Sequence, residues 1–137
     1  MNHWIIALPR KDMLHCIKIG TFGLGRKFIL GHVQKGDRVA CYVTKEYKII
    51  ALGETTSDYY VDITPVFEKD GLFPDRFNFK AEQLPDDAEL DFMTVIGKMS
   101  FVKNLAYWSA YFRNGVVRIS ASDWNTLVSR TKQLAKE

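Results

Sequence analysis

The residues best suited to chemistry in this sequence are aromatic and basic. Residues 98–113 interleave five aromatic side chains with three cations, and the whole chain holds 18 aromatic residues. Aromatic faces stack on nucleobases, which contributes about 1–3 kcal/mol per base, while lysine and arginine attract phosphates. The pattern suits a base-reading surface. Packing of Phe101, Trp108 and Phe112 in a hydrophobic core, with the cations at its border, is the simpler explanation of the same residues.

Motifs for catalysis and metal binding are missing from the sequence. His3, His15 and His32 lack the spacing of a metal-binding motif, and no G-x-S-x-G nucleophile motif is present. Cys16 and Cys41 make neither a disulfide framework nor a zinc ligand set, so we expect both in the core. The sequence therefore predicts no catalytic residue, no metal and no cofactor.

A glycine-spaced loop covers residues 20–27. It lacks the G-K-[ST] ending of a phosphate-binding P-loop, and no clear helix follows it. Its backbone amides, together with Arg26 and Lys27, could receive a phosphate as a small anion nest, whereas a plain flexible turn is the alternative.

Charge is distributed unevenly along the 137 residues. The net charge is +3, but five acids and no base lie within residues 82–91, which leaves 19 cations against 11 anions elsewhere. A basic body with a separate acidic segment suits an anionic partner, although a solvated surface would give the same totals. The acidic segment itself is expected to be a solvated loop and helix start.

The pattern of apolar residues, glycines and prolines predicts one domain over residues 1–137, of the α+β class, with a mostly antiparallel, barrel-like sheet and flanking helices. Asp12 is expected to cap the first helix and Gly20 to end it as the C′ residue, and Ser120 with Asp123 to form a capping box on the last helix. Strands are expected over 4–8, 38–43, 49–56, 72–80 and 116–119, and helices over 12–19, over 91–96 and from 120 onward.

No stretch of the sequence is suited to a membrane. The longest unbroken apolar run covers residues 4–8, far short of the roughly 20 residues that span a bilayer, and a charged segment follows it directly. We therefore expect a cytoplasmic protein.

Seven short motifs, in order along the chain, resemble the EVE domain of the PUA-like superfamily, which is related to YTH domains. The resemblance covers residues 2 to about 128. The motifs are Trp4-Ile5-Ile6 with Pro9-Arg10, Thr21-Phe22-Gly23-Leu24, Lys35-Gly36-Asp37 before Tyr42-Val43, residues 53–57 before Tyr59-Tyr60, residues 73–77, residues 100–104 with Trp108, and Arg118-Ile119 before Asp123.

The resemblance implies a non-catalytic module that accepts a base flipped out of DNA or RNA into an aromatic-lined pocket, with modified bases, especially modified cytosines, as the suspected ligands. Two departures bear on ligand choice. Phe22 stands where the family commonly has Trp, and Asp12-Met13 stands where it often has Asn-Trp. An ionised Asp12 only accepts hydrogen bonds, whereas an Asn also donates them.

By motif position, the resemblance assigns residues to two roles. The base pocket would be formed by Trp4, Phe22, Leu24, Ser57, Tyr59, Trp108 and Ser109, and phosphates would be bound by Arg26, Lys27, Lys103, Arg113 and Arg118. A small-molecule, nucleoside-binding or hydrolytic domain on the same fold is the alternative. A structural subunit whose side chains fill the cavity is the third.

Overall fold

Apolar strands form one mixed, curled sheet, and helices cover both of its faces. The computed structural model describes residues 1–25, 28–67, 73–103, 110 and 112–136, with the backbone only at 28 and 29. The strands are β1 (His3–Leu8), β2 (Thr21–Leu24), β3 (Arg38–Val43), β4 (Lys48–Thr55), β5 (Tyr60–Val61), β6 (Asp75–Gln83), β7 (Leu90–Asp91) and β8 (Val116–Ile119). The α-helices are α1 (Arg10–Ile19) and α2 (Ala121–Ala135), and the short 3-10 helices are η1 (Phe28–His32), η2 (Asp86–Ala88), η3 (Phe92–Thr94) and η4 (Ile96–Lys98).

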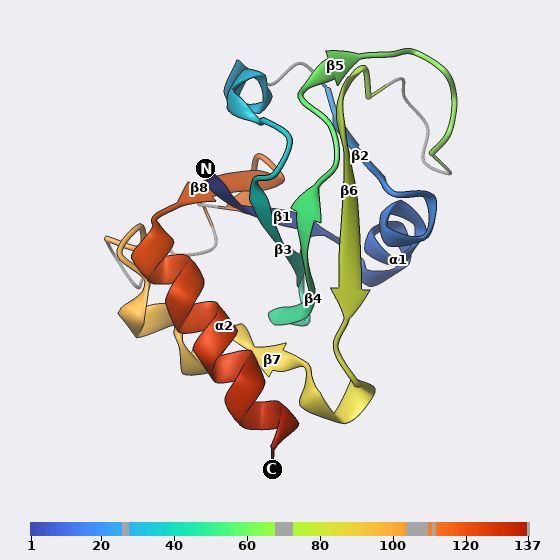
Figure 1. Cartoon of the computed structure of the whole chain (residues 1–137). Coiled ribbons are helices and arrows are strands. Elements are labelled where there is room, and N and C mark those ends of the chain that lie inside the picture. The colour runs from blue at the N-terminus through green and yellow to red at the C-terminus, as the bar shows by residue number, and fades with distance from the viewer. Residues whose placement is uncertain (26–27, 68–72, 104–109, 111, 137) are drawn as a thin grey trace.

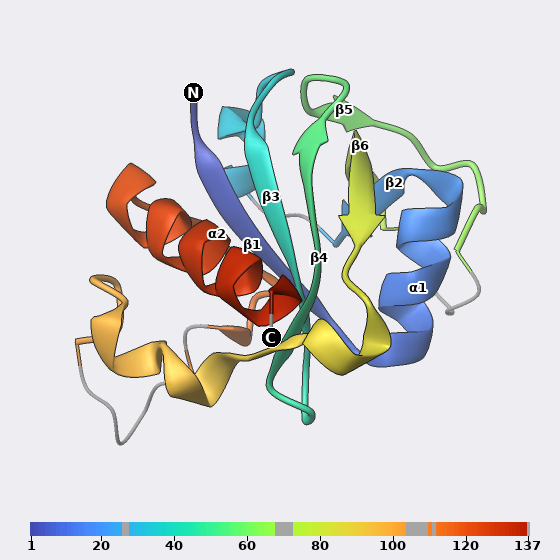
Figure 2. The same ribbon diagram turned by 60° about the horizontal axis from the view of Figure 1, so that its bottom comes forward.

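The sheet runs in the order β2-β6-β4-β3-β1-β8, with β5 paired to β6 and β7 paired to β4. Among the described strands, only β1 and β3 pair in parallel, so the expected mostly antiparallel α+β sheet is confirmed. Figures 1 and 2 show α1 and α2 on opposite sides of the central strands.

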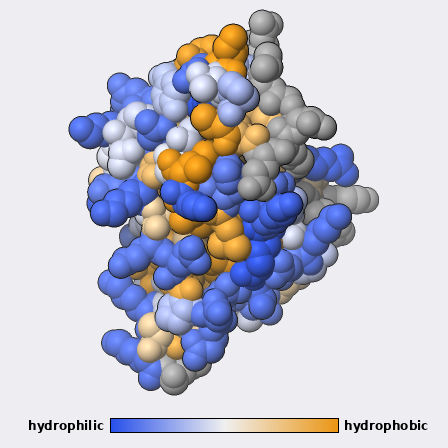
Figure 3. Space-filling model, turned by 90° about the vertical axis from the view of Figure 1, so that its right-hand side faces the viewer, coloured by the Kyte–Doolittle hydropathy of each residue, from blue (hydrophilic) through white to orange (hydrophobic). Residues whose placement is uncertain are grey.

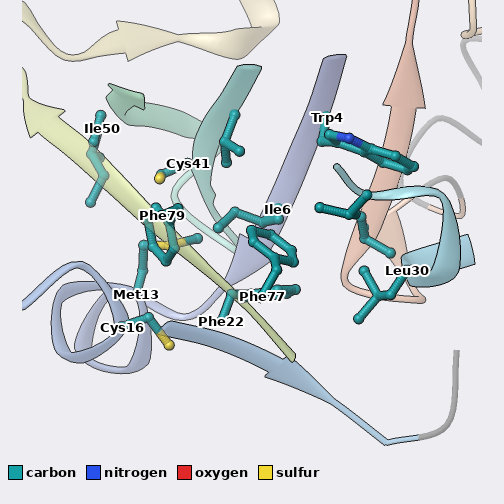
Figure 4. Close-up of a cluster of buried hydrophobic side chains, with 14 of the residues drawn as sticks. Trp4, Ile6, Met13, Cys16, Phe22, Leu30, Cys41, Ile50, Phe77 and Phe79 are labelled. Atoms are coloured by element: carbon teal, nitrogen blue, oxygen red, sulfur yellow. The ribbon is translucent and has the colours of Figure 1, made fainter. Parts of the chain in front are cut away.

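Both faces of β1 are buried, which explains why its sequence is continuously apolar rather than alternating. Trp4 and Ile6 point into a first core cluster that also contains Met13 and Cys16 from α1 (Figure 4). Ile5 and Ala7 point the other way, into a second cluster that contains Leu127 of α2. The strand therefore belongs to two cores at once.

The ends of α1 differ partly from the expectation. The helix begins at Arg10 directly after Pro9, so Asp12 lies in its first turn and is not its cap. Proline suits this place because its fixed φ leads into a helix and its missing N–H is not needed there. Gly20 ends the helix in the left-handed conformation, with φ 72°, as predicted.

Half of the expected capping box forms at α2. The side chain of Ser120 accepts a hydrogen bond from the Asp123 amide. The Asp123 carboxylate, however, is buried and accepts from the backbone amide of Ser100 at 2.9 Å and from its hydroxyl at 2.8 Å. Asp123 thus ties the segment after η4 to the helix.

Two other expectations need correction. The predicted helix over residues 91–96 is instead a pair of 3-10 turns, η3 and η4. The acidic segment 82–91 is more ordered than a solvated loop: it includes the end of β6, η2 and β7, and its Glu89 pairs with Arg10 at 2.8 Å. Gly53 shows the close approach expected of a strand glycine, because a Cβ there would lie 2.0 Å from the carbonyl oxygen of Lys80.

A buried carboxylate joins the start of β1 to the turn before β3. Asp37 is 1% exposed and accepts hydrogen bonds from the Trp4 indole at 3.0 Å and from the amides of Asn2 and Gln34, both at 2.9 Å. Burial alone would raise the pKa of Asp37, but these hydrogen bonds outweigh it and hold that pKa below its ordinary value.

We predict that Asp37→Asn destabilises the protein by about 1–3 kcal/mol at neutral pH, because an amide cannot accept from all three donors. A carboxyl with a lowered pKa stabilises the fold above its unfolded pKa of about 3.9, and this contribution is lost as the pH falls through its folded pKa. The difference in the free energy of unfolding between variant and wild type, measured by urea denaturation, should therefore become smaller below about pH 4. Exposed Asp87→Asn is the matched control. Equal stability of Asp37→Asn and wild type at neutral pH would contradict this account.

Candidate functional site

A cavity of about 340 Å³ opens where β1 ends and α1 begins. Its volume lies at the lower end of the roughly 300–1,000 Å³ typical of small-ligand sites. The lining residues come from the end of β1, from α1, β2 and the turn after β3, and from the segments before β6 and β8. They are Ala7, Leu8, Pro9, Asp12, His15, Cys16, Gly23, Leu24, Thr44, Phe67, Phe73, Phe112, Arg113, Asn114 and Gly115.

Three phenylalanines form the aromatic part of the wall. Phe67 and Phe73 meet edge to face, with ring centroids 5.8 Å apart. Phe112 stacks on Tyr42 at 4.4 Å with the planes 9° apart, and it is 7% exposed. Phe112 therefore belongs both to the second core cluster and to the cavity wall. For this residue, core packing and a place at a binding surface are compatible.

Polar groups are few in this wall and come from separate elements. Asp12 and His15 lie on α1, Thr44 follows β3, and Arg113 and Asn114 lie before β8. Among the described lining residues, Asp12 is the one carboxylate and Arg113 the one arginine or lysine. An apolar wall with a few polar groups is usual in sites that bind and orient a small molecule.

Cys16 also lines the cavity, but it is not suited to act as a nucleophile. Burial raises the pKa of the Cys16 thiol to about 12, and a nearby Asp12 adds to the shift. The thiolate is the reactive form of cysteine, so this side chain is an apolar wall atom at neutral pH. Within the described residues, no group of three or more His, Cys, Asp or Glu side chains is placed to hold a metal ion.

Two of the residues predicted from sequence, Leu24 and Arg113, line the cavity. Trp4 and Phe22 do not. Both are fully buried in the first core cluster, where Phe22 contacts Phe77 at a centroid distance of 5.4 Å (Figure 4). Figure 4 shows Trp4 at the end of this cluster near Leu30 of η1 and Phe22 nearer to α1, and neither side chain lines the cavity.

Ser57 and Tyr59 lie outside the cavity lining and stabilise the chain after β4. The Ser57 hydroxyl accepts a hydrogen bond from the Asn78 amide at 2.9 Å. The Tyr59 hydroxyl donates to the Asp75 carboxylate at 3.0 Å, and this hydrogen bond raises the pKa of Tyr59. Their neighbours are therefore other polar groups of β6.

Of the predicted phosphate-binding cations that the structure describes, only Arg113 lines the cavity. Arg118 lies on β8, where its guanidinium stands 5.8 Å from the Trp4 ring centroid and donates to the Asn2 side chain. Lys103 is exposed and does not line the cavity. Arg26, Lys27, Trp108 and Ser109 lie outside the described residues.

Sequence reasoning missed His15, Thr44, Phe67 and Asn114 as cavity residues. The sequence predicts a loop over residues 20–27, whereas Thr21–Leu24 form β2, and a glycine inside a strand marks a close approach of another segment. A Cβ at Gly23 would lie 2.7 Å from the Phe67 ring and 3.0 Å from the Phe73 carbonyl oxygen. The glycine indicates that something packs there, but it does not say which residue.

No family model matches the chain. The chain is 25% identical over 130 residues to UPF0310 protein PH1033 of Pyrococcus horikoshii. The matched region covers 86% of this chain and 90% of that protein.

Solved structures share its fold. The Mmi1 YTH domain has a TM-score of 0.68 at 11% identity, covering 99% of this chain and 91% of that chain. Human THYN1, solved in complex with 5-methylcytosine containing DNA, has a TM-score of 0.64 at 12% identity, covering 96% and 98%. The expected fold is thereby confirmed, since the chain shares it with the YTH domain of Mmi1 and with THYN1. Among the described helices, none has both the length and the apolar character needed to cross a bilayer.

The buried thiols give a prediction about reactivity. We expect Cys16 and Cys41 in the folded protein to react with a disulfide reagent at about pH 8 at least roughly tenfold more slowly than in denaturant, because burial raises the pKa of both thiols. Absorbance of the released thiolate measures the rate. Complete reaction of either thiol in the native protein at the denatured rate would contradict the burial of that side chain.

Proposed function

We propose that the protein is a non-catalytic reader of a modified base in nucleic acid, and that the flipped base occupies the cavity beside Asp12. The observation that carries the proposal is the composition of that cavity: phenylalanine walls, one carboxylate and one arginine within a space suited to a single ring. The shared fold with THYN1, which was solved with 5-methylcytosine containing DNA, supports it.

The cavity suits an aromatic ring with a polar edge. Flipping a base out of its stack costs a few kcal/mol of stacking and pairing free energy, and contacts in the pocket must offset this cost. Phe67, Phe73 and Phe112 offer apolar and aromatic surface for the ring, and Leu8 and Leu24 extend it. A methyl group on the base gains further from apolar burial, by about 0.8 kcal/mol when fully buried.

Asp12 would set which edge of the base is accepted. An ionised carboxylate only accepts hydrogen bonds, and the exocyclic amino group of cytosine donates them, whereas thymine and uracil present a carbonyl oxygen at the corresponding place. We therefore propose an amino-bearing base, with modified cytosine as the first candidate.

Phosphate contacts belong to the proposal as well. Arg113 lines the cavity and is exposed, so it can reach the phosphates that flank a flipped base. Lys103 and Arg118 are exposed and remain candidates for further contacts, as do Arg26 and Lys27. With so few cations we expect only a small electrostatic contribution from the nucleic-acid backbone to the affinity.

The test is a titration with oligonucleotides that carry cytosine or 5-methylcytosine at one position, in DNA and in RNA, over a salt series. We expect tighter binding of one modified oligonucleotide and a slope of log K against log salt of roughly −2 to −3, as two or three phosphate contacts would give. Binding of the free nucleoside alone, unaffected by salt, would instead support the small-molecule alternative.

Asp12→Asn tests the choice of base. We predict that the variant binds the cytosine-type oligonucleotide roughly tenfold more weakly, since the charged acceptor becomes a neutral amide oxygen, while a thymine or uracil analogue gains a donor. Fluorescence anisotropy measures both affinities. Thermal unfolding of the variant, measured in the same buffer, separates a loss of folded protein from a change in base preference. An unchanged preference would argue against a base at Asp12.

Arg113→Gln tests the phosphate contact. Its loss should weaken binding of all oligonucleotides by a similar factor and reduce the magnitude of the salt slope by about 0.9. Arg130→Gln is the matched control, because Arg130 lies on α2, on the other side of the sheet from α1 (Figure 2). An identical slope for Arg113→Gln and wild type would exclude Arg113 from the interface.

A further inference from the structure

One wall of the cavity is a segment with little regular structure. Residues 62–67, called the wall segment below, follow β5 and end in Phe67 at the cavity, and Phe73 lies opposite Phe67 before β6. The wall segment sits on the α1 side of the molecule, which Figure 3 faces, where hydrophobic surface shows among hydrophilic side chains.

The wall segment is not held by burial of its own aliphatic side chains. Ile63 is 63% exposed and Val66 is 38% exposed. Aliphatic side chains left in water contribute little to fixing a segment, since the hydrophobic effect scales with the area removed from water. Other contacts must therefore set the position of Phe67.

A buried arginine makes those contacts. Arg76 of β6 is 1% exposed, and its side chain donates to the Thr64 carbonyl oxygen at 2.6 Å and to the Phe73 carbonyl oxygen at 2.9 Å. Its guanidinium carbon also lies 5.0 Å from the centroid of the Phe67 ring, within the range of a cation–π contact. One side chain thus touches both aromatic wall residues and the backbone between β5 and Phe67.

Neighbouring elements complete the attachment. The His15 imidazole of α1 lies 2.8 Å from the Val66 carbonyl oxygen, and the Asp62 amide donates to the Pro74 carbonyl oxygen at 2.9 Å. Gly23 of β2 leaves room for the Phe67 ring, because a Cβ there would come within 2.7 Å of it. The Asp62 carboxylate, by contrast, is 3.9 Å from the Arg76 guanidinium and is 44% exposed, which makes it a weak partner.

Burying a guanidinium is unfavourable unless its donors are satisfied, so a fully buried arginine needs a reason. We propose that Arg76 is a positioning residue for the cavity: it fixes Phe67 and Phe73 in place before a ligand arrives. The ligand part of this inference rests on the proposed function. A preformed aromatic wall improves affinity because the ordering of its side chains has already taken place.

The experiment compares Arg76→Met with wild type by amide hydrogen exchange and by oligonucleotide binding. Methionine keeps an apolar stem and removes the donors and the charge. We expect exchange in residues 62–67 to rise at least about tenfold, with β1, β3 and β4 unchanged, and affinity for the 5-methylcytosine oligonucleotide to fall by a similar factor. Arg38→Met is the control, because Arg38 is a half-buried arginine of β3 that pairs with Glu54, away from the cavity lining. It should change neither measurement.

Gly23→Ala keeps the test informative if Arg76→Met does not fold. Its added methyl group displaces the Phe67 ring without removing a charge, and we expect faster exchange in the wall segment and weaker binding. Phe67→Leu combined with Arg76→Met should weaken binding by less than the product of the single effects, since Arg76 acts through Phe67.

Three results would overturn the inference: exchange in residues 62–67 that stays at the wild-type rate, exchange that rises equally in every strand, or a loosened wall segment with full affinity. Selective loosening in Arg76→Met when wild type binds no oligonucleotide would support the positioning of the wall by Arg76 and reject the proposed function. The two failures are therefore distinguishable.

Discussion

The structure depends on the burial of β1 on both of its faces. Successive side chains of a strand point to opposite sides, so Trp4 and Ile6 belong to the first core cluster, which also contains Met13 of α1, while Ile5 and Ala7 belong to the second, which contains Leu127 of α2. The parallel pairing with β3 and the antiparallel pairing with β8 fix this strand in the sheet. Because β1 ends at the cavity, the same constraint places Leu8, Pro9 and the first turn of α1 in its wall.

The site itself is built from parts that are far apart in sequence. Asp12 and His15 lie on α1. Phe67 ends the wall segment, Phe73 lies shortly before β6, and Phe112 lies shortly before β8. The helix α1 holds Asp12 and His15, and the core holds Phe112, which stacks on Tyr42 of β3. The Phe67 side instead relies on a buried guanidinium. The cavity thus combines a wall fixed by the core with one fixed by polar contacts.

Much of the fold could be predicted from local sequence. The apolar run at 4–8, the glycine that ends α1 and the serine that caps α2 each act through neighbouring residues, and all three are confirmed. The cavity could be predicted only in part. Leu24 and Arg113 line it, but Trp4 does not, since a strand buried on both faces offers no periodicity that separates a pocket side from a core side. Phe67 was missed because its place depends on contacts with Arg76 and Gly23, which the sequence does not reveal.

The net charge of +3 is compatible with many functions, so the positions of the cations matter more than their number. Among the described residues, one arginine reaches the cavity, which suits recognition of a single base with few phosphate contacts rather than a grip on a long backbone. The central claim is that this base occupies the cavity beside Asp12. The most direct measurement follows backbone amide chemical shifts while a 5-methylcytosine oligonucleotide is added. The account predicts that the largest changes fall on Asp12, His15, Leu24 and residues 113–115, whereas changes confined to α2 would contradict it.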